Sequence, residues 1–328
     1  MNYKFLFIQL FMIGLLLTLT NSCKKDDTTA SSKKDPIITW AIPADITVGK
    51  LLSVTQLNAT ADVPGIFVYT PALGVKLNAG ANQDLKVAFA PTDASNYNTA
   101  SKTVKINVTQ PTGDGGVTSA VFNPTKTYGT MTDQNGNTYK TITIGTQTWM
   151  AENLRVTKYR NGDPIPNVTD NAAWKALTTG AYCSYGNTAN KDDIASYGRL
   201  YNWYAASESR NIAPAGWHVP TDAEWTTLTT TLLGETRAGG KMKEAGTTHW
   251  KYVNIDATNE SGFTALPSGS RNSSEGIFCL LGYFGWWWSS TADGAADAWS
   301  HIPDYSDASC VRGSYTKQDG FAMRLVKD

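Results

Sequence analysis

Histidine and cysteine are scarce in this sequence, and neither sign of charge is in excess. The 328 residues include three histidines and four cysteines. His218, His249 and His301 are too widely spaced for a zinc site, and we predict neither a metal nor another cofactor. Lysine plus arginine and aspartate plus glutamate number 28 each. Because nucleic-acid binders typically carry a basic stripe, we expect no nucleic-acid partner.

Short catalytic signatures are also missing. The sequence has no glycine-rich phosphate loop and no Gly-x-Ser-x-Gly nucleophile turn. His218, Asp222 and Glu224 lie close together, and such a trio is a candidate for acid–base chemistry. However, Thr221 and Glu224 have the spacing of a helix capping box, which already employs the carboxylate. We therefore favour a structural role for the trio and predict that the protein is not an enzyme.

The N-terminus carries a long apolar run. Phe5 to Leu17 follow an early lysine, and small polar residues lead to Cys23. This is the layout of a secretory signal, and the run is shorter than the roughly 20 apolar residues that a membrane anchor needs. Residues 1–22 are predicted to be a signal peptide. Residues 23–35 are polar and charged, and they are predicted to form a flexible tether.

Cys23 resembles the acylated cysteine of bacterial lipoproteins, and the residues after it, Lys-Lys-Asp-Asp, resemble an export signal for the outer face of the outer membrane. The resemblance implies lipidation at Cys23 and a membrane partner reached through the lipid. It also implies a location at the outer membrane or cell surface. The alternative is an ordinary signal peptide followed by a free or buried cysteine.

Residues 36–110 have the pattern of a β-sandwich. Apolar side chains alternate with polar or small ones from Leu85 to Phe89 and from Val104 to Val108. Proline and glycine turn signals separate these short strands. Residues 91–100 resemble the end of bacterial immunoglobulin-like repeats, in which Tyr97 would be the corner tyrosine. The resemblance implies an immunoglobulin-like spacer. A linker is predicted at residues 111–120, which are rich in glycine.

Residues 121–328 form a second module, which contains ten of the eleven tryptophans. Few helices and many short strands predict an α+β fold. The capping box predicts a helix that begins after Thr221, presents one apolar face from Trp225 to Leu232 and stops at Gly234. Phe321 to Leu325 alternate as a predicted final strand.

Several motifs of this module occur in the order found in one family, the Fibrobacter succinogenes major paralogous domain (FISUMP), which is common in secreted lipoproteins. We identify residues 121–328 as resembling this domain. The motifs are Trp149-Met-Ala-Glu-Asn-Leu154, Tyr197-Gly-Arg-Leu-Tyr-Asn-Trp203, Gly216-Trp-His-Val-Pro-Thr-Asp-Ala-Glu-Trp225, Trp287-Trp-Ser-Ser-Thr291 and Arg324-Leu-Val-Lys-Asp328.

More remotely, the module resembles formylglycine-generating enzymes and the C-type-lectin-like fold. The lectin resemblance implies a compact head whose loops bind a glycan or a surface protein, as in adhesion. The enzymes use a metal-binding cysteine pair near the C-terminus, where this chain has Cys310 alone. The calcium motifs of lectins are absent. We predict a non-catalytic binding module; the alternatives are an enzyme of this fold and a purely structural surface protein.

Residues 286–288 are three consecutive tryptophans. In a strand, Trp286 and Trp288 face one side and Trp287 faces the other. One interpretation is that core packing covers both sides. The other is that Trp287 lines a ligand-binding aromatic platform with Tyr283, Trp250 or Trp299.

The cysteines after Cys23 are Cys183, Cys279 and Cys310. In an oxidising compartment they permit one disulfide and leave one thiol. Because Cys279 and Cys310 flank the tryptophan strand, we predict that they form the pair.

Overall fold

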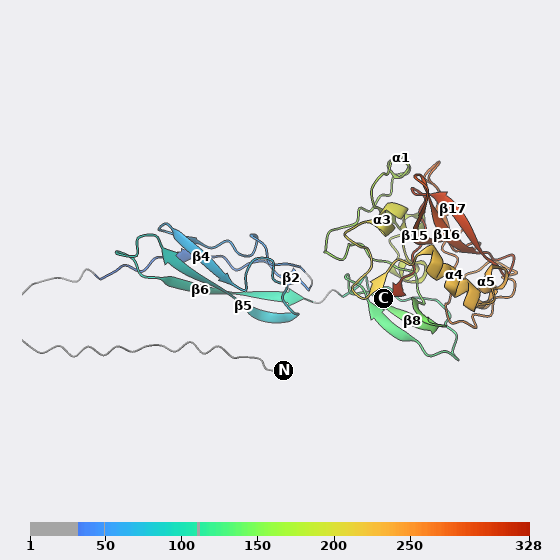
Figure 1. Ribbon diagram of the computed structural model, residues 1–328, viewed down its shortest axis with the longest axis horizontal. Coiled ribbons are helices and arrows are strands. Elements are labelled where there is room, and N and C mark those ends of the chain that lie inside the picture. The colour runs from blue at the N-terminus through green and yellow to red at the C-terminus, as the bar shows by residue number, and fades with distance from the viewer. Residues whose placement is uncertain (1–31, 49, 110–111) are drawn as a thin grey trace, which may run out of the picture.

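The computed structural model describes residues 32–48, 50–109 and 112–328. The chain is mostly β in these ranges, with an N-terminal β region and a C-terminal α+β region (Figure 1). The predicted signal peptide and the lipidation site at Cys23 lie outside the described residues. Within the described ranges, each helix is too short or too polar to cross a membrane.

The N-terminal β region contains a sheet with strand order β2-β6-β5-β4, next to a small β1-β3 pair. β2 runs parallel to β6, and the other pairs are antiparallel. The alternation predicted for β5 and β6 is confirmed, because every second residue from Leu85 to Phe89 and from Val104 to Val108 is buried. The strand bounds are β1 Ile38–Thr39, β2 Ile46–Thr47, β3 Thr60–Ala61, β4 Gly65–Thr70, β5 Gly80–Pro91 and β6 Ala100–Thr109.

This sheet buries one of its faces. The inward side chains pack with Trp40, Leu52 and Leu57. On the outward face, Ile66 is 70% exposed and Val68 is 60% exposed among the described residues. A β region at the N-terminal end is therefore confirmed, whereas its immunoglobulin-like class stays a prediction.

Residues 113–121, which we call the strap, are bonded to the C-terminal region. The backbone N–H of Val117 donates to Asp192 Oδ1 at 2.9 Å, and that of Ser119 donates to Ser196 Oγ at 2.9 Å. The N–H of Val121 donates to Glu244 Oε1 at 2.6 Å. Most of the linker predicted at residues 111–120 is thus part of the C-terminal region rather than a free connection.

The C-terminal region is built around a sheet with strand order β12-β18-β9-β8-β7, antiparallel throughout. The predicted final strand from Phe321 to Leu325 is not found, because the last strand, β18, lies after it at Val326–Lys327. Ala322 and Arg324 are as buried as Phe321, Met323 and Leu325, so this stretch is enclosed on both sides rather than alternating. The strand bounds are β7 Gly129–Thr132, β8 Thr138–Ile144, β9 Gln147–Met150, β12 Trp217–His218 and β18 Val326–Lys327.

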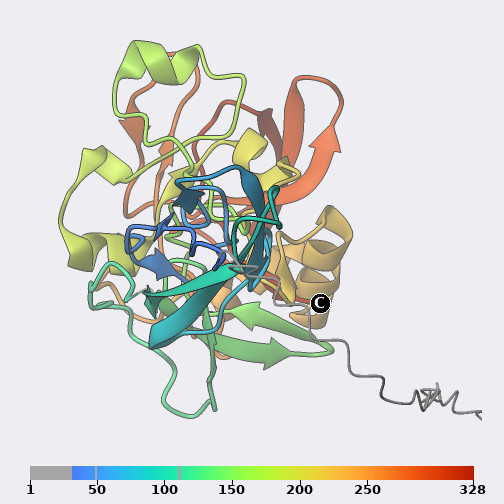
Figure 2. The ribbon, with the colours of Figure 1, turned by 90° about the vertical axis from the view of Figure 1, so that its left-hand side faces the viewer.

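A second sheet, β15-β16-β17, packs against helices α4 and α5. Figure 2 shows these helices beside the orange strands, in agreement with Figure 1. The bounds are β15 Trp287–Asp293, β16 Asp297–Pro303, β17 Cys310–Thr316, α4 Asp222–Thr231 and α5 Glu235–Met242. The remaining elements are α1 Asn171–Lys175, β10 Tyr182–Cys183, the 3-10 helix η1 Tyr185–Asn187, α2 Lys191–Tyr197, β11 Leu200–Tyr201, α3 Trp203–Ser207, β13 Ser270–Arg271 and β14 Phe278–Cys279.

The predicted capping box at the start of α4 is confirmed. Thr221 Oγ1 accepts the backbone N–H of Glu224, and Glu224 Oε2 accepts that of Thr221 at 2.7 Å. His218 Nε2 lies 2.8 Å from Glu224 Oε1, and its Nδ1 lies 2.6 Å from Asp328 Oδ1. The histidine therefore ties the helix start to the chain terminus. Asp222 bonds instead to His301 and Arg312.

These contacts predict a pH window of stability. Burial alone would lower the pKa of His218, but hydrogen bonds to Asp328 and Glu224 outweigh it and raise the pKa above 6.5. Burial would raise the pKa of Glu224, but bonds from Thr221 and His218 lower it below 4.5. The contribution of His218 to folding stability is complete below pH 6.5 and is lost as the pH rises through the raised pKa of the histidine. The glutamate contribution is complete above pH 4.5 and is lost as the pH falls through the lowered pKa.

Replacing His218 by glutamine should therefore reduce thermal stability most in the window between these two values, and less in alkaline solution. The measurement is the difference in melting temperature between parent and variant as a function of pH. A difference that stays constant across the whole range would show that the charge of His218 is not involved.

The three consecutive tryptophans are core residues. Trp286 is 7% exposed, and Trp287 and Trp288 are fully buried. Trp286 and Trp288 both pack on Phe321, whereas Trp287 packs with Trp225 in a different cluster. Trp286 precedes β15, and Trp287 and Trp288 begin it. Trp286 and Trp288 thus face one side and Trp287 the other, as predicted, and both sides are filled.

A buried arginine joins these parts of the core. The guanidinium of Arg324 donates to Asn153 Oδ1 at 2.7 Å and to the carbonyls of Phe263 at 2.5 Å and Thr264 at 2.8 Å. The indole N–H of Trp287 donates to the same Asn153 oxygen at 2.9 Å. Burial lowers the pKa of Arg324 to about 9, so it stays charged at neutral pH. Its positive charge is stabilised by hydrogen bonds to neutral oxygen atoms rather than by a hydrogen bond to a carboxylate.

Candidate functional site

The structure corrects the predicted aromatic platform. Trp287 is 0% exposed and Trp250 is 1% exposed, with its indole N–H donated to the Ala265 carbonyl at 2.9 Å. Trp299 is half-buried, and the guanidinium of Arg312 covers its ring at 3.1 Å from the centroid. Tyr283 is half-buried beside Tyr305. The four rings do not form a common surface for a ligand, because core packing has already used two of them.

The predicted disulfide is not formed. Cys279 and Cys310 are both free thiols, and Cys183 is free as well. Cys310 is buried in the core with the α4 and α5 side chains. Burial raises the pKa of Cys183 and of Cys310 to about 12, so each is a neutral thiol at physiological pH. Neither is suited to act as a thiolate nucleophile or metal ligand.

Acidic, histidine and cysteine side chains do not converge elsewhere. In residues 32–48, 50–109 and 112–328, no group of three or more of them could hold a metal ion. Hydrogen bonds also occupy the trio near the α4 start. Burial alone would raise the pKa of Asp222, but hydrogen bonds from His301 and Arg312 outweigh it and lower this pKa to about 2. Asp222 is therefore a permanent anion in an ion pair rather than a proton carrier.

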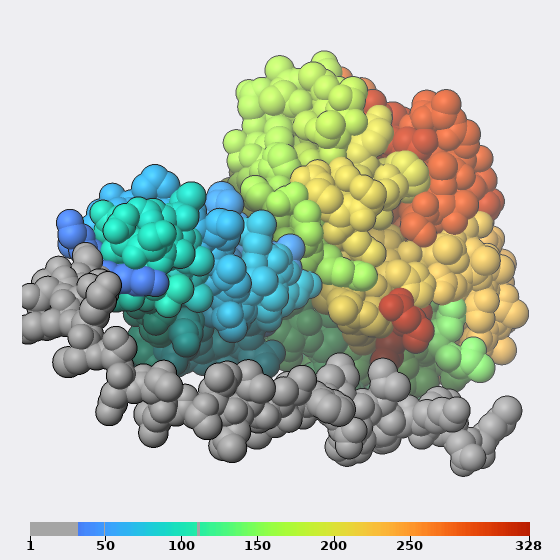
Figure 3. Space-filling model, turned by 60° about the vertical axis from the view of Figure 1, so that its left-hand side comes forward, coloured from blue at the N-terminus to red at the C-terminus, as the bar shows by residue number. Residues whose placement is uncertain are grey.

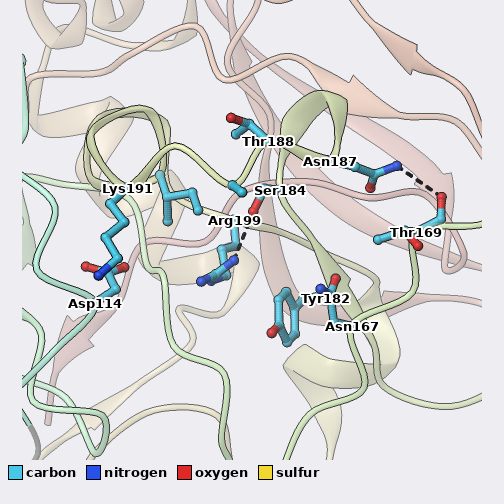
Figure 4. A pocket seen from close by; sticks show the side chains of 11 residues that line it. Asp114, Asn167, Thr169, Tyr182, Ser184, Asn187, Thr188, Lys191 and Arg199 are labelled. Atoms are coloured by element: carbon cyan, nitrogen blue, oxygen red, sulfur yellow. Dashed lines mark hydrogen bonds between the residues drawn. The ribbon is translucent and has the colours of Figure 1, made fainter.

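An open hollow on the C-terminal region brings polar side chains together instead. We call it the polar pocket; its volume is about 320 Å³. Figure 3 shows that the yellow-green segment that carries much of it forms a protruding part of the surface. The pocket is lined by Asp114, Asn167, Thr169, Tyr182, Ser184, Asn187, Thr188, Ala189, Lys191, Ile194 and Arg199 (Figure 4).

Local sequence explains why these residues surround a hollow. β10 ends at Cys183 and its partner β11 begins at Leu200, and the chain between these paired residues forms η1 and α2. Asn190 caps α2 by accepting the N–H of Asp192 at 2.9 Å. Gly198 ends the helix with φ of 75°, a conformation that favours glycine. A Cβ at Gly198 would lie 2.5 Å from Asn153 Cβ, so glycine also permits close packing there.

Arg199 is held in a fixed position at the centre of the polar pocket. Its Nε donates to the Arg155 carbonyl at 3.0 Å, and its Nη1 donates to Ser184 Oγ at 2.9 Å. Its guanidinium lies 4.9 Å from the centroid of the Tyr182 ring. Burial raises the pKa of Tyr182, which keeps the phenol neutral. The strap supplies another wall, and Figure 4 shows Lys191 extending toward Asp114.

A smaller hollow of about 220 Å³, the Arg155 hollow, shares Asp114 and Arg199 with the polar pocket. Arg155 Nε lies 3.3 Å from Asp114 Oδ1, and the two side chains are only 7% and 18% exposed. Asp114 Oδ2 and Arg155 Nη1 are buried and have no hydrogen-bond partner among the described residues. A buried polar atom without a partner costs free energy, so a ligand that supplies both a donor and an acceptor would be stabilised here.

Sequence reasoning missed this site. The motif from Tyr197 to Trp203 contained Arg199 and was used only as a family landmark, and Asp114 lay in the predicted linker. A usable signal was present in the many asparagine, threonine and serine residues between 167 and 190. Their number alone does not reveal that they face one hollow.

Fold and site together define a class: a β region followed by an α+β domain that presents a polar, open pocket. Residues 142–327 match the Fibrobacter succinogenes major domain, and the chain belongs to this family. No curated protein and no solved structure matches the chain. The family predicted from the motifs is thus confirmed.

Proposed function

We propose that this protein is a surface-exposed bacterial lipoprotein whose C-terminal domain binds a glycan in the polar pocket without chemical turnover. In this proposal Cys23 carries the lipid, and residues 36–109 are an immunoglobulin-like spacer. The FISUMP domain is the lectin-like head. The sequence left both a glycan and a protein as candidate ligands. The composition of the polar pocket favours the glycan.

The chief support is the mixture of donors and acceptors in one hollow. Asn167, Asn187 and Thr188 each offer a neutral polar group at its rim, and Asp114 and Arg199 add charged ones. Sugars present closely spaced hydroxyls, each of which can both donate and accept. A folded peptide surface would need larger apolar contacts than this hollow offers. The arrangement also lacks an activated nucleophile among its lining residues, which fits binding rather than reaction.

Glycan-array binding by the mature chain tests the proposal, with Asn167→Ala as the variant. The Asn167 side chain is exposed and makes no hydrogen bond to the described residues, so its removal should leave the fold intact. Loss of one neutral hydrogen bond should lower the affinity for the retained glycan by about two- to tenfold. Tyr283→Ala is the control, because Tyr283 lies outside the polar pocket.

Binding that falls in Asn167→Ala and persists in Tyr283→Ala supports the proposal. The reverse pattern would move the site to the aromatic residues near Tyr283. If the array retains no glycan and the chain is captured only by a protein surface, the glycan proposal is wrong.

A further inference from the structure

We infer that the glycan bound in the polar pocket carries a carboxylate, and that Lys191 and Arg199 recognise it. This inference rests on the proposed function and adds to it the charge class of the ligand. Acidic saccharides such as uronic-acid or sialic-acid oligosaccharides have the required chemistry.

The first argument is the balance of charge around the polar pocket. Its charged lining residues are Asp114, Lys191 and Arg199. Asp114 lies beside a cation outside this lining, Arg155, with 3.3 Å between Oδ1 and Nε. Arg155 therefore compensates the negative charge of Asp114, and the polar pocket keeps a net positive charge even though Lys191 extends toward Asp114. In the described part of the chain, neither Lys191 nor Arg199 makes an ion pair.

Two other acidic residues on α2 do not change this balance decisively. Asp192 Oδ1 accepts the backbone N–H of Val117 in the strap, and its carboxylate is not part of the lining. Asp193 lines an adjoining hollow, which shares Thr188 and Ile194 with the polar pocket. Its Oδ2 accepts a hydrogen bond from Thr188 Oγ1 at 3.4 Å, so this carboxylate has a partner at the rim. Both carboxylates are exposed to solvent, which screens them. Lys191 and Arg199 line the polar pocket itself and are therefore closer to a ligand there.

The second argument is the geometry of Arg199. Its Nε and Nη1 already donate to protein acceptors, so the guanidinium plane is fixed before a ligand binds. Its Nη2 makes no hydrogen bond to the described residues and is available. The Tyr182 ring supports the guanidinium from one side. A preorganised donor of this kind loses little conformational entropy when it binds a carboxylate, and charge-assisted hydrogen bonds are the stronger class.

The third argument is the position of Lys191 relative to the neutral residues. Figure 4 shows Lys191 on one side of Arg199, with Asn187, Thr169 and Asn167 on the other. Asn187 Nδ2 donates to the Thr169 carbonyl at 3.1 Å, which orients the asparagine. A sugar ring with one carboxylate would place its charged end toward Lys191 and Arg199 and its hydroxyls toward the amides.

The test compares acidic oligosaccharides with their carboxyl-reduced counterparts on one array, using the full mature chain. Acidic glycans should be retained at least about tenfold better than the reduced ones, because one charge-assisted hydrogen bond contributes roughly that factor. Lys191→Gln should lower the affinity for the acidic glycan by about tenfold and change that for the reduced glycan much less. Lys175→Gln is the matched control, since Lys175 is an exposed lysine outside the polar pocket.

Arg199→Gln is expected to have a similar effect, but it also loses bonds to Arg155 and Ser184. Lys191→Gln, with an exposed side chain, therefore decides the result, and circular dichroism confirms its fold. Equal retention of acidic and reduced glycans overturns the inference and leaves the proposed function standing. An equal loss of both in Lys191→Gln also overturns it. Retention of no glycan at all overturns the proposed function itself.

Discussion

Replacing Trp287 by alanine is expected to lower the free energy of unfolding of the C-terminal region by about 3–5 kcal/mol, the usual cost of truncating a buried aromatic side chain. The ring is fully buried, and its centroid lies 6.0 Å from that of Phe263 and 6.3 Å from that of Trp225. The variant would leave a cavity and would remove a donor from Asn153 Oδ1. Calorimetry of the mature chain, in which the two regions can unfold in separate transitions, measures the effect.

Trp299→Ala is the control for this variant. Trp299 is half-buried and stacks on Arg312 at the surface, so its loss should cost about 1 kcal/mol or less. Comparing the two variants distinguishes the effect of losing a buried core side chain from the effect of losing any tryptophan. A Trp287→Ala protein that unfolds at the same temperature as the parent would contradict the burial of this ring.

The second large effect is expected from Arg324→Met, which should destabilise the C-terminal region by about 3–5 kcal/mol. Methionine fills a similar volume but leaves the carbonyls of Phe263 and Thr264 without their donor inside the core. Arg324→Lys should also destabilise, because an ammonium cannot reach acceptors arranged around a planar guanidinium. Urea titration followed by near-ultraviolet circular dichroism gives the free energies.

Arg210→Met is the matched control. Arg210 is a partly exposed arginine whose ion pairs with Asp163 and Glu208 lie at the surface. Such pairs contribute about 1 kcal/mol or less. Equal effects of the two arginine substitutions would show that Arg324 is not specially placed.

The two large effects should not be additive. Trp287 and Arg324 donate to the same oxygen of Asn153. When one donor has been removed, part of the network around the other is already lost. The double variant is therefore expected to be less destabilised than the sum of the two single variants.

Local patterns in the sequence predicted local structure well. The alternation in β5 and the capping box before α4 depend on neighbouring residues, and both are found. The predicted strand near the end of the sequence was wrong, because Ala322 and Arg324 are as buried as the apolar residues on either side of each. A two-residue period in hydrophobicity indicates a strand with one face exposed to solvent, whereas both sides of this stretch are buried.

The polar pocket could not be predicted for a different reason. Asp114 and Arg199 are 85 positions apart, and it is the docking of the strap and the β10-β11 ladder that places them together. No sequence period links such residues. The aromatic platform failed because the burial of an indole depends on what covers it, and a strand pattern predicts only the side to which it points.

The strap gives the molecule a mechanical property. If the C-terminal region is pulled away from the N-terminal region, the tension first reaches the bonds of Gly113 to Asn135 and of Asp114 to Asn137. The bonds of Val117, Ser119 and Val121 follow. Asp114, a wall of the polar pocket, lies nearest to the pulled end. Peeling the strap would therefore dismantle the pocket first, while the sheets stay intact. A ligand bound to Asp114 would in turn raise the force needed to detach the strap. Pulling force would thus weaken ligand binding, and bound ligand would strengthen the attachment of the strap.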